Sequence, residues 1–493
     1  GDQAALALYN LPALLLQESE RPDLAILANF SASAERLDEL MQIQFERNAR
    51  AQREINPAIE HEMVEERFMG ETLHFDEVFD GEATYIEDGY ALVDGVFILA
   101  RPEARLRTLV ESVKSGNERQ ISASLAYQRA REESGPVDLM LYLNLESTLP
   151  SLNAALLEKA MKGGMAMFGA SGKSLEAALS LRALQAFYID CAIGEDDIRS
   201  RSGILYREKA GLLQLLAYEK GGVPRADFVP EGILSSTVAR FDLSGMFARL
   251  EALLGVASPS TPALINIQLQ QVKTKTGVDL RSAFLENFGA GFVSFSLLPE
   301  DRSGDDVFAP AQQVYVIDIK DAAALSGALE ALKDMVPGAR AHIKTRDFQG
   351  ETIHTFPGIT NPSTPDATGY NFSFAVTRTH LVYAVGRPGL IQGILTSMQS
   401  RDSGFWQTEA TQEMIDRIGK TDVVSRSYTD FGQVAATLAE TLSGAALLSG
   451  GAGAFDPSAV SSLDLPWHMM TETYEATDGI FSEMLLVRKE GAQ

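Results

Sequence analysis

A repeated pentapeptide contains the residues best suited to carry chemistry. Gly-Glu-Thr-Leu-His at positions 70–74 recurs as Gly-Glu-Thr-Ile-His at positions 350–354, an offset of 280 residues (350 − 70). On a β-strand the side chains alternate between two faces, so Glu71 and His74 cannot converge on one ligand, whereas Thr72 and His74 share a face. A duplicated ligand site would use Thr72, His74, Thr352 and His354. The pattern favours the alternative, a tight glycine turn followed by a half-exposed strand.

A second segment has part of a metal-binding pattern. His61-Glu62-Met63-Val64-Glu65 contains half of a zinc-protease signature, but the second histidine is missing. If this segment is a helix, His61 and Glu65 stand one turn apart and suit a surface pair better than a metal site. The chain has six histidines, and no two of them have the spacing of metal ligands. The sequence therefore predicts no metal site.

A third segment ends like a phosphate-binding loop. Residues 167–174 finish with Gly172-Lys173-Ser174, but the glycine that such a loop needs five residues earlier is replaced by Met167. A loop between two helices is the favoured interpretation. The Gly-x-Ser-x-Gly motif of a nucleophile elbow is missing from the sequence. We therefore expect no catalytic residue and no cofactor.

Two segments rich in small residues, 163–168 and 445–455, occupy corresponding places in the two halves of the chain. The first also contains Met165, Met167 and Phe168, and methionine adapts well to irregular apolar surfaces. These residues are the best candidates for contact with an apolar ligand, a protein partner or a membrane. A loosely packed loop over the core is the favoured alternative.

The composition excludes some classes of partner. The chain of 493 residues has 42 Lys and Arg against 67 Asp and Glu, a formal charge of −25. Nucleic acid and anionic membrane surfaces would repel such a protein. With 45% hydrophobic and 22% charged residues the composition is that of an ordinary globular protein. The single cysteine, Cys191, lies in an apolar run and is expected to be a small buried residue.

The ends of the chain suggest a processed protein. No stretch reaches the roughly 18 apolar residues that span a bilayer. The chain begins with Gly1 rather than Met, so we expect a signal or anchor segment before it.

Further matches indicate an internal duplication. In the same order as the pentapeptides, residues 99–102 match 385–388, 142–145 match 428–431, and 204–207 match 485–488. We predict a first copy in 1–211 and a second in 212–493, which includes the connecting segment 212–309. The second copy would begin near Phe228, so the matching start of the first copy would lie before Gly1.

Two local patterns predict the fold class. Strands that end in Asn or Asp and continue into a helix recur around Asn29, Asn144, Asp242, Asp318 and Asp430. The polar side chain is expected to cap the helix rather than to bind a ligand. Asp94-Gly95 and Asp478-Gly479 predict hairpin turns. Since hairpins dominate, we expect an α+β fold of tandem duplicated modules, each of antiparallel sheets covered by helices.

Most of the chain resembles a known family in the pattern of its elements. Residues 314–321 form an apolar strand ending in Asp before a helix, followed by the turn Phe348-Gln349-Gly350 and a strand pair with a helix at 374–395. An Asn-Phe-Gly segment at 287–289 precedes them. This order is similar to that of bacterial exported proteins grouped as a domain of unknown function, family 3352. The resemblance implies an exported, periplasmic or cell-envelope location and no specific chemistry.

Two functional hypotheses follow. The first is a non-catalytic envelope protein whose duplicated modules bind a protein partner or an apolar ligand, with a membrane anchor in a segment outside this sequence. The second is a hydrolase whose site is assembled from distant residues. Clustered carboxylates or histidines with perturbed pKa values in a cleft would favour the hydrolase. An apolar groove would favour the binding protein.

Overall fold

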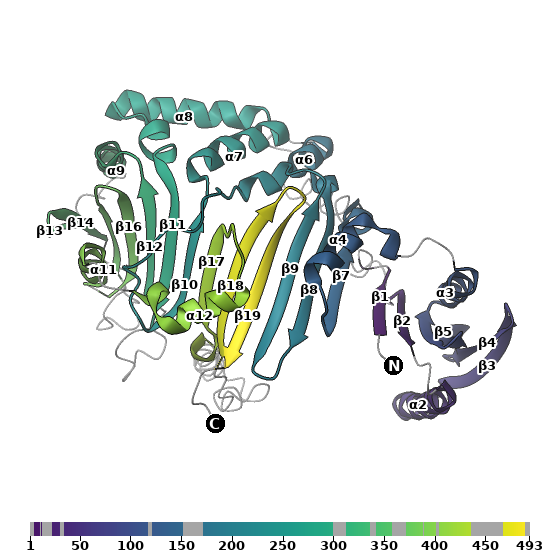
Figure 1. Cartoon of the computed structure of the whole chain (residues 1–493). Coiled ribbons are helices and arrows are strands. Elements are labelled where there is room, and N and C mark those ends of the chain that lie inside the picture. Colours follow the sequence, from purple (N-terminus) through teal and green to yellow (C-terminus); the bar gives the residue numbers. More distant parts are fainter. Residues whose placement is uncertain are drawn as a thin grey trace. The chain divides into compact units, whose positions relative to one another are not determined.

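The computed structural model describes residues 4–9, 11, 22–29, 34–116, 121–150, 171–298, 312–335, 342–356, 371–387, 389–400, 404–434 and 467–488. They form an α+β fold with two antiparallel sheets (Figure 1), so the predicted fold class is confirmed. The chain divides into two compact units, Gly1–Gln128 with Ser147–Leu156, and Arg129–Glu146 with Leu157–Gln493. Among the described residues, no helix is both long and apolar enough to cross a membrane.

The first unit contains a six-stranded sheet with the order β1-β2-β6-β5-β4-β3. Its strands are β1 (Ala4–Leu8), β2 (Leu24–Asn29), β3 (Glu60–Phe68), β4 (Glu71–Phe79), β5 (Thr84–Val93) and β6 (Val96–Arg101). Its helical segments are α2 (Ala34–Ile55), α3 (Glu103–Ser115) and the 3-10 turn η1 (Ile121–Ala123). The next helix, α4 (Leu125–Ser134), spans the boundary between the units in the chain.

Two-residue turns connect strands of this sheet. Met69 and Gly70, with φ of 50° and 88°, join β3 to β4. Asp94 and Gly95, with φ of 50° and 82°, join β5 to β6. Positive φ at both positions is characteristic of the type I′ turn, whose twist matches that of the strands it joins. The hairpin predicted at Asp94-Gly95 is confirmed.

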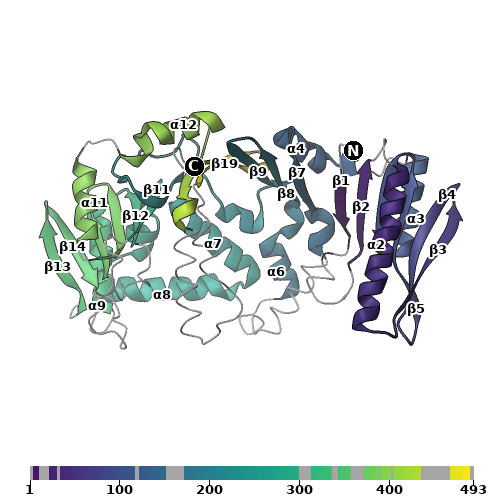
Figure 2. The same cartoon turned by 90° about the horizontal axis from the view of Figure 1, so that it is seen from below.

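The two faces of this sheet meet different helices. Leu106 of α3 packs with Leu73 and Phe75 of β4 on one face. Because side chains alternate along a strand, His74 and Asp76 lie on the other face. Helix α2 covers that second face, as the views in Figures 1 and 2 show.

The second unit contains a thirteen-stranded sheet with the order β13-β14-β15-β16-β12-β11-β10-β17-β18-β19-β9-β8-β7. Its strands are β7 (Leu139–Asn144), β8 (Leu184–Ile193), β9 (Asp197–Tyr206), β10 (Ile233–Arg240), β11 (Phe288–Leu297), β12 (Gln312–Ile319), β13 (Lys344–Phe348), β14 (Glu351–Phe356), β15 (Asn371–Val376), β16 (His380–Gly386), β17 (Ser425–Asp430), β18 (Trp467–Ala476) and β19 (Gly479–Arg488).

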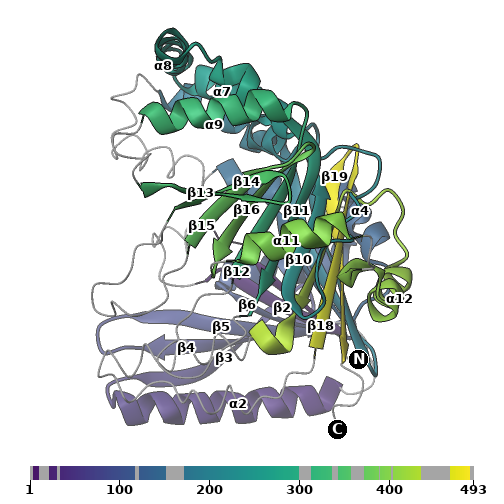
Figure 3. The same ribbon diagram turned by 90° about the vertical axis from the view of Figure 1, so that its left-hand side faces the viewer.

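The described helices of this unit are α6 (Gly172–Leu179), α7 (Leu243–Ala257), α8 (Ser260–Thr276), α9 (Ala322–Met335), α11 (Leu390–Gln399) and α12 (Glu409–Ile418). Shorter helical turns are η3 (Leu181–Ala183), η4 (Gly211–Leu215), η5 (Arg281–Leu285) and η6 (Phe405–Gln407). Ile391 and Leu395 of α11 belong to the same buried core as Val382 of β16. Helix α9 lies over the opposite face, where Lys333 contacts His354 of β14 (Figure 3).

Pairing of β9 with β19 joins β7, β8 and β9 to the rest of the large sheet. Two buried charged residues lie next to this junction. Glu472 of β18 and Glu483 of β19 lie opposite each other in register, and their exposed fractions are 0% and 3%. The guanidinium of Arg426 donates to Glu472 at 2.6 Å. Glu483 lies within 4 Å of three cations, Arg199, Arg201 and Lys420. Burial, reinforced by Glu483, raises the pKa of Glu472.

The Asp residues that follow strands act mainly as predicted. Asp242 caps α7, since its Oδ1 accepts a hydrogen bond of 2.8 Å from the amide of Gly245. Asp430 caps the turn after β17 in the same way. Asp318 differs, because its carboxylate accepts instead from the amide of Gly291 on the neighbouring strand β11. That carboxylate therefore links two strands of the sheet.

The compact units divide the chain differently from the predicted copies. Residues 1–211 were expected to form one copy, yet β7, β8 and β9 pair within the sheet of the second unit. A sequence repeat is defined by the order of similar segments along the chain, whereas a compact unit is defined by which segments pack together. The two divisions therefore need not coincide. The copy boundaries at 211 and 212 therefore stay a prediction.

We expect the Arg426→Met substitution to lower the free energy of unfolding by about 3–5 kcal/mol, since it leaves the buried Glu472 carboxylate without its partner. The double variant Arg426→Met with Glu472→Leu should recover most of that loss, because no charge then remains unpaired. Urea unfolding of both variants measures the difference. Equal destabilisation of the single and double variants would contradict the argument.

Candidate functional site

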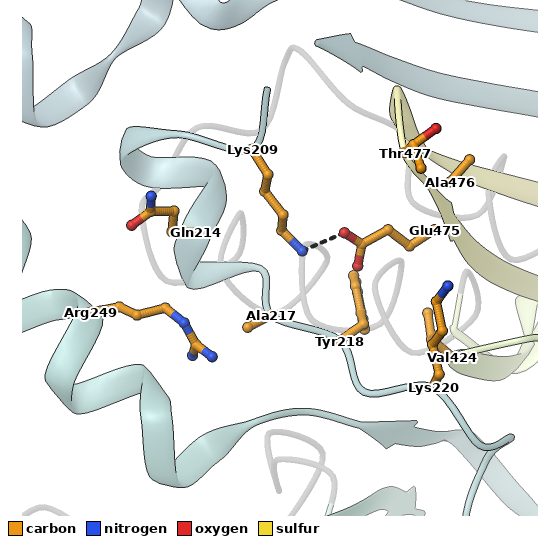
Figure 4. Close-up of a pocket in the computed structure, with 10 residues that line it drawn as sticks. All are labelled: Lys209, Gln214, Ala217, Tyr218, Lys220, Arg249, Val424, Glu475, Ala476 and Thr477. Carbon is orange, nitrogen blue, oxygen red and sulfur yellow. Dashed lines mark hydrogen bonds and ion pairs between the residues drawn. The ribbon is translucent and has the colours of Figure 1, made fainter. Parts of the chain in front are cut away.

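A pocket of about 420 Å³ lies in the second unit where the end of β18, the segment after β9 and helix α7 meet (Figure 4). Its lining residues are Lys209, Gln214, Ala217, Tyr218, Lys220, Arg249, Val424, Glu475, Ala476 and Thr477. They come from four separated parts of the chain. The pairing of β9 with β19 brings them together, because the amide of Tyr206 donates to the carbonyl of Asp478 at 3.0 Å.

One side of the pocket is held by an ion pair. The ammonium of Lys209 donates to Oε1 of Glu475 at 2.6 Å. The hydroxyl of Tyr206 lies 3.4 Å from the same oxygen and 3.3 Å from the carbonyl of Ala476. Burial, together with the charge of Glu475, raises the pKa of Tyr206 to about 12, so this phenol stays neutral.

The opposite side is formed by Arg249 of α7. Its guanidinium is bonded to the carboxylate of Asp242, the residue that caps the same helix. Burial acts to raise the pKa of Asp242, but hydrogen bonds from Gly245 and Arg249 outweigh it and hold that pKa below its ordinary value. Asp242 therefore stays ionised and fixes the direction of the arginine.

An aromatic ring lies between these two sides. The ring of Tyr218 stacks on that of Phe241, with centroids 4.9 Å apart. Burial, with a contribution from Glu475, raises the pKa of Tyr218. In Figure 4, Arg249 and Lys220 lie to either side of Tyr218, and a dashed line marks the ion pair of Lys209 with Glu475. A planar or apolar part of a ligand would contact this ring.

The charges indicate which ligand chemistry fits. Lys209, Lys220 and Arg249 are cationic. Lys209 is bonded to Glu475, the one carboxylate of the described lining, and Arg249 is bonded to Asp242. Lys220 is exposed and makes no ion pair with a described residue. The described lining contains no histidine and no cysteine. The arrangement is suited to holding an anion.

A second hollow, of about 460 Å³, runs along α8. Its described lining comes from that helix alone, between Asn266 and Lys275, and includes the exposed Ile267. One helix does not define a binding site, so we base no function on this hollow.

The pentapeptide residues lie on strands of two different compact units. Thr72 and His74 are on β4, after the turn at Met69-Gly70. The ring of His74 stacks on Tyr90 of β5, with centroids 4.6 Å apart. The turn is the one that the glycine predicts, and the strand is half-buried as expected.

Thr352 and His354 are on β14, after the turn at Gln349-Gly350, where φ is 52° and 87°. The ring of His354 stacks on Phe374 with centroids 4.7 Å apart, and its Nδ1 lies 2.9 Å from the ammonium of Lys333. Thr352 is exposed and donates to Asp347 at 2.9 Å. Burial and the nearby Lys333 charge lower the pKa of His354. None of these four residues lines the pocket described above.

Several other predicted features have varied outcomes. Met165, Met167 and Phe168 lie outside the described residues, as does the segment 445–455. Ser171 and Ser174 of the loop-like motif form a capping box at the start of α6. These two hydroxyls thus serve the helix terminus. Cys191 is half-buried on β8 rather than fully buried.

The interpretation of His61 as a helical surface residue is wrong. His61 lies on strand β3, and its side chain is only 1% exposed. Its Nδ1 lies 2.9 Å from Oδ1 of Asp76, and Glu65 instead approaches His74 at 3.6 Å. Burial raises the pKa of Asp76, although the contact with His61 acts in the other direction. The spacing of four residues between His61 and Glu65 does not distinguish a helix from a strand, because in either structure it places both side chains on the same face.

Sequence reasoning missed the pocket residues. They are dispersed between positions 209 and 477, and no motif joins them. One signal was available, since residues 199–225 contain six basic and two acidic side chains in a strongly acidic protein. That local excess of positive charge marks the segment from which Lys209 and Lys220 reach the pocket.

We expect the pKa of His354 to rise when Lys333 is replaced by Met, because a neighbouring positive charge is removed. In the native protein the folded-state pKa lies below the ordinary 6.5, so the unfolded chain binds the proton more readily. Stability should therefore fall as the pH drops below 6.5, and fall less in the variant. NMR titration and urea unfolding from pH 5 to 8 measure both effects, with Lys344→Met on β13 as the control. An unshifted His354 in the native protein would refute this prediction.

Comparisons with known proteins do not add to this picture. The chain matches no protein-family model, no curated protein and no solved structure. The resemblance to family 3352 therefore stays a prediction. The functional argument rests on the geometry of the described residues.

Proposed function

We propose that this protein is a non-catalytic binding protein whose pocket at Lys209, Lys220 and Arg249 holds a small organic anion. The observation that carries the proposal is the convergence of three cations on one 420 Å³ pocket in a protein of net charge −25. Charge-assisted hydrogen bonds to a carboxylate or phosphate are stronger than those between neutral groups. The ring of Tyr218 adds an apolar wall for the remainder of the ligand.

This proposal keeps the expected function class and changes the expected ligand. An apolar ligand was anticipated, but the described pocket residues are largely polar or charged. The hydrolase alternative receives no support from this pocket, since its one carboxylate is bonded to a lysine. A protein partner remains compatible with the proposal, because an acidic side chain or chain terminus presents the same anionic group.

We also propose that the chain arose by tandem duplication. The second copy has the strand order β13-β14-β15-β16-β12-β11, and the corresponding strands of the first copy have the order β3-β4-β5-β6-β2-β1. The order β17-β18-β19 likewise corresponds to β7-β8-β9. The pentapeptide hairpins fall on equivalent strands, β3-β4 and β13-β14. Related sequences in which the two hairpin turns fail to recur together would count against this proposal.

One strand has no counterpart in this scheme. In the second copy β10 lies between β11 and β17, whereas their equivalents β1 and β7 are each the last strand of a sheet. This arrangement supports the proposal that the first copy lacks its initial strand. It also leaves β7 with exposed apolar residues at the sheet edge, Leu139 and Leu141, which are 69% and 60% exposed.

The proposed location is the bacterial cell envelope, on the basis of the family resemblance. We expect the product of the full reading frame to fractionate with the periplasm or membrane of its cell. Immunoblotting of cell fractions, with a cytoplasmic enzyme as marker, provides the measurement. Recovery of the whole product with the cytoplasmic marker would refute the proposed location.

For the pocket, we expect saturable binding of phenyl phosphate by isothermal titration calorimetry, and no binding of uncharged benzyl alcohol. The Lys220→Gln substitution should weaken that binding at least tenfold, about 1.4 kcal/mol, because it removes one of the three cations. This lysine is suitable because it makes no ion pair with a described residue, so its removal leaves no unpaired carboxylate among them.

The matched control is Lys344→Gln, which removes the same charge from an exposed position on β13. It should leave binding unchanged within twofold. Equal weakening by both variants would show a general charge effect and refute the pocket, as would binding that is unaffected by Lys220→Gln.

A further inference from the structure

We propose that His61, Asp76 and Glu87 form a binding site for a divalent transition metal ion, with Zn²⁺ as the expected occupant. The three residues lie on adjacent strands β3, β4 and β5 of the first unit. One ligand atom from each lies within 4.8 Å of the other two. An imidazole with two carboxylates is a ligand set that zinc uses in proteins. This site is separate from the cationic pocket and does not depend on the function proposed for it.

The contacts of His61 point to a cation. Its Nε2 lies 3.1 Å from Oε1 of Gln52, and with the amide turned this way Nε2 carries the proton that is donated there. In the neutral ring Nδ1 then presents a lone pair, yet it lies 2.9 Å and 3.2 Å from the two oxygens of Asp76. Two acceptors then face each other at this contact. A proton or a metal ion between them removes the conflict, as does reversal of the Gln52 amide.

Glu87 favours the metal ion over the proton. A proton satisfies one contact between two acceptors, whereas a metal ion bonds three or four at once. A tetrahedral zinc ion with bonds of about 2 Å holds its ligand atoms about 3.3 Å apart. Nδ1 of His61 lies 3.2 Å from Oδ2 of Asp76, close to this spacing, and 2.9 Å from Oδ1. Glu87 would have to move closer to complete the site, since its ligand atom lies within 4.8 Å of the other two.

A β-bulge in the backbone places Glu87 next to Asp76. In the pairing of β4 with β5, Glu87 and Asp88 together lie opposite the single residue Asp76, which is a β-bulge. Arg101 donates to both oxygens of Asp88 at 2.8 Å and to the backbone carbonyl of Glu87 at 2.9 Å, and it also forms an ion pair of 3.6 Å with the Glu87 carboxylate. Bulges commonly redirect a side chain next to a functional site.

The hairpin itself does not need these carboxylates. At the offset of 280 residues that aligns the two pentapeptides, Phe356 stands in the place of Asp76. The second hairpin, β13-β14, forms with the same turn and pairing. The cluster is therefore a property of the first unit rather than a requirement of the shared strand arrangement. Gln52 supplies the outer hydrogen bond that orients a histidine ligand.

The test is titration of the chelator-treated full chain with ZnCl₂ by isothermal titration calorimetry. We expect one equivalent to bind, and Glu87→Gln to weaken it at least tenfold. Gln52→Met should weaken it by about 10–100-fold, because it removes the hydrogen bond that orients His61. The control Glu62→Gln removes a neighbouring exposed carboxylate of β3 and should leave the affinity unchanged.

A second measurement keeps the proposal testable if a variant fails to fold. In ¹⁵N NMR spectra of the native protein, Zn²⁺ should shift Nδ1 of His61 while Nε2 keeps its proton. The proposal is overturned if no zinc binds, if the Nδ1 resonance does not respond, or if folded Glu87→Gln binds zinc as tightly as the native chain. The last result would place the ion elsewhere on the acidic surface.

Discussion

The pairing of β9 with β19 is the interaction on which the second unit depends. It joins β7-β8-β9 to the ten strands that begin at β13, so that residues far apart in the sequence share one sheet. Beside this pairing the sheet buries Glu472 and Glu483 opposite each other. Two facing carboxylates in the interior are tolerated because Arg426 bonds one and three further cations surround the other. The charge balance at this position and the strand pairing therefore require each other.

The same pairing accounts for the pocket. Tyr206 ends β9 beside the turn after β18, so the chain that follows, with Lys209 and Lys220, lies next to Glu475. Helix α7 then contributes Arg249, whose direction is set by the Asp242 cap. Asp242 therefore has two roles. It accepts a hydrogen bond from a free amide at the start of α7, and it orients the guanidinium of Arg249 at the pocket.

The first unit shows the opposite arrangement of charge. There the carboxylates of Asp76 and Glu87 converge with an imidazole, on the face of the sheet that α2 covers. The second unit collects cations in a pocket, and the first collects acceptors around a buried histidine. A solvated acidic surface would distribute its charges evenly. The two clusters depart from that distribution, since each gathers groups of one kind in a small volume.

The sequence alone determined the features that depend on neighbouring residues. Asp94-Gly95 and the pentapeptide glycines predicted their turns, and Asp242 predicted a helix cap, because these structures are set by backbone geometry over two to four residues. The order of the repeated segments supports the proposed duplication. Whether a segment forms a strand or a helix was harder to predict, as the segment around His61 illustrates. A spacing of four residues places two side chains on one face in either structure.

Only the tertiary structure decided which distant side chains meet. Lys209, Arg249 and Glu475 converge because strands from both ends of the chain pair in one sheet, and no local pattern records that pairing. Glu87 reaches Asp76 because of a bulge, a single extra residue that changes the register without a distinct motif. Charges act through space over several ångströms, so their partners are set by the packing of the whole sheet.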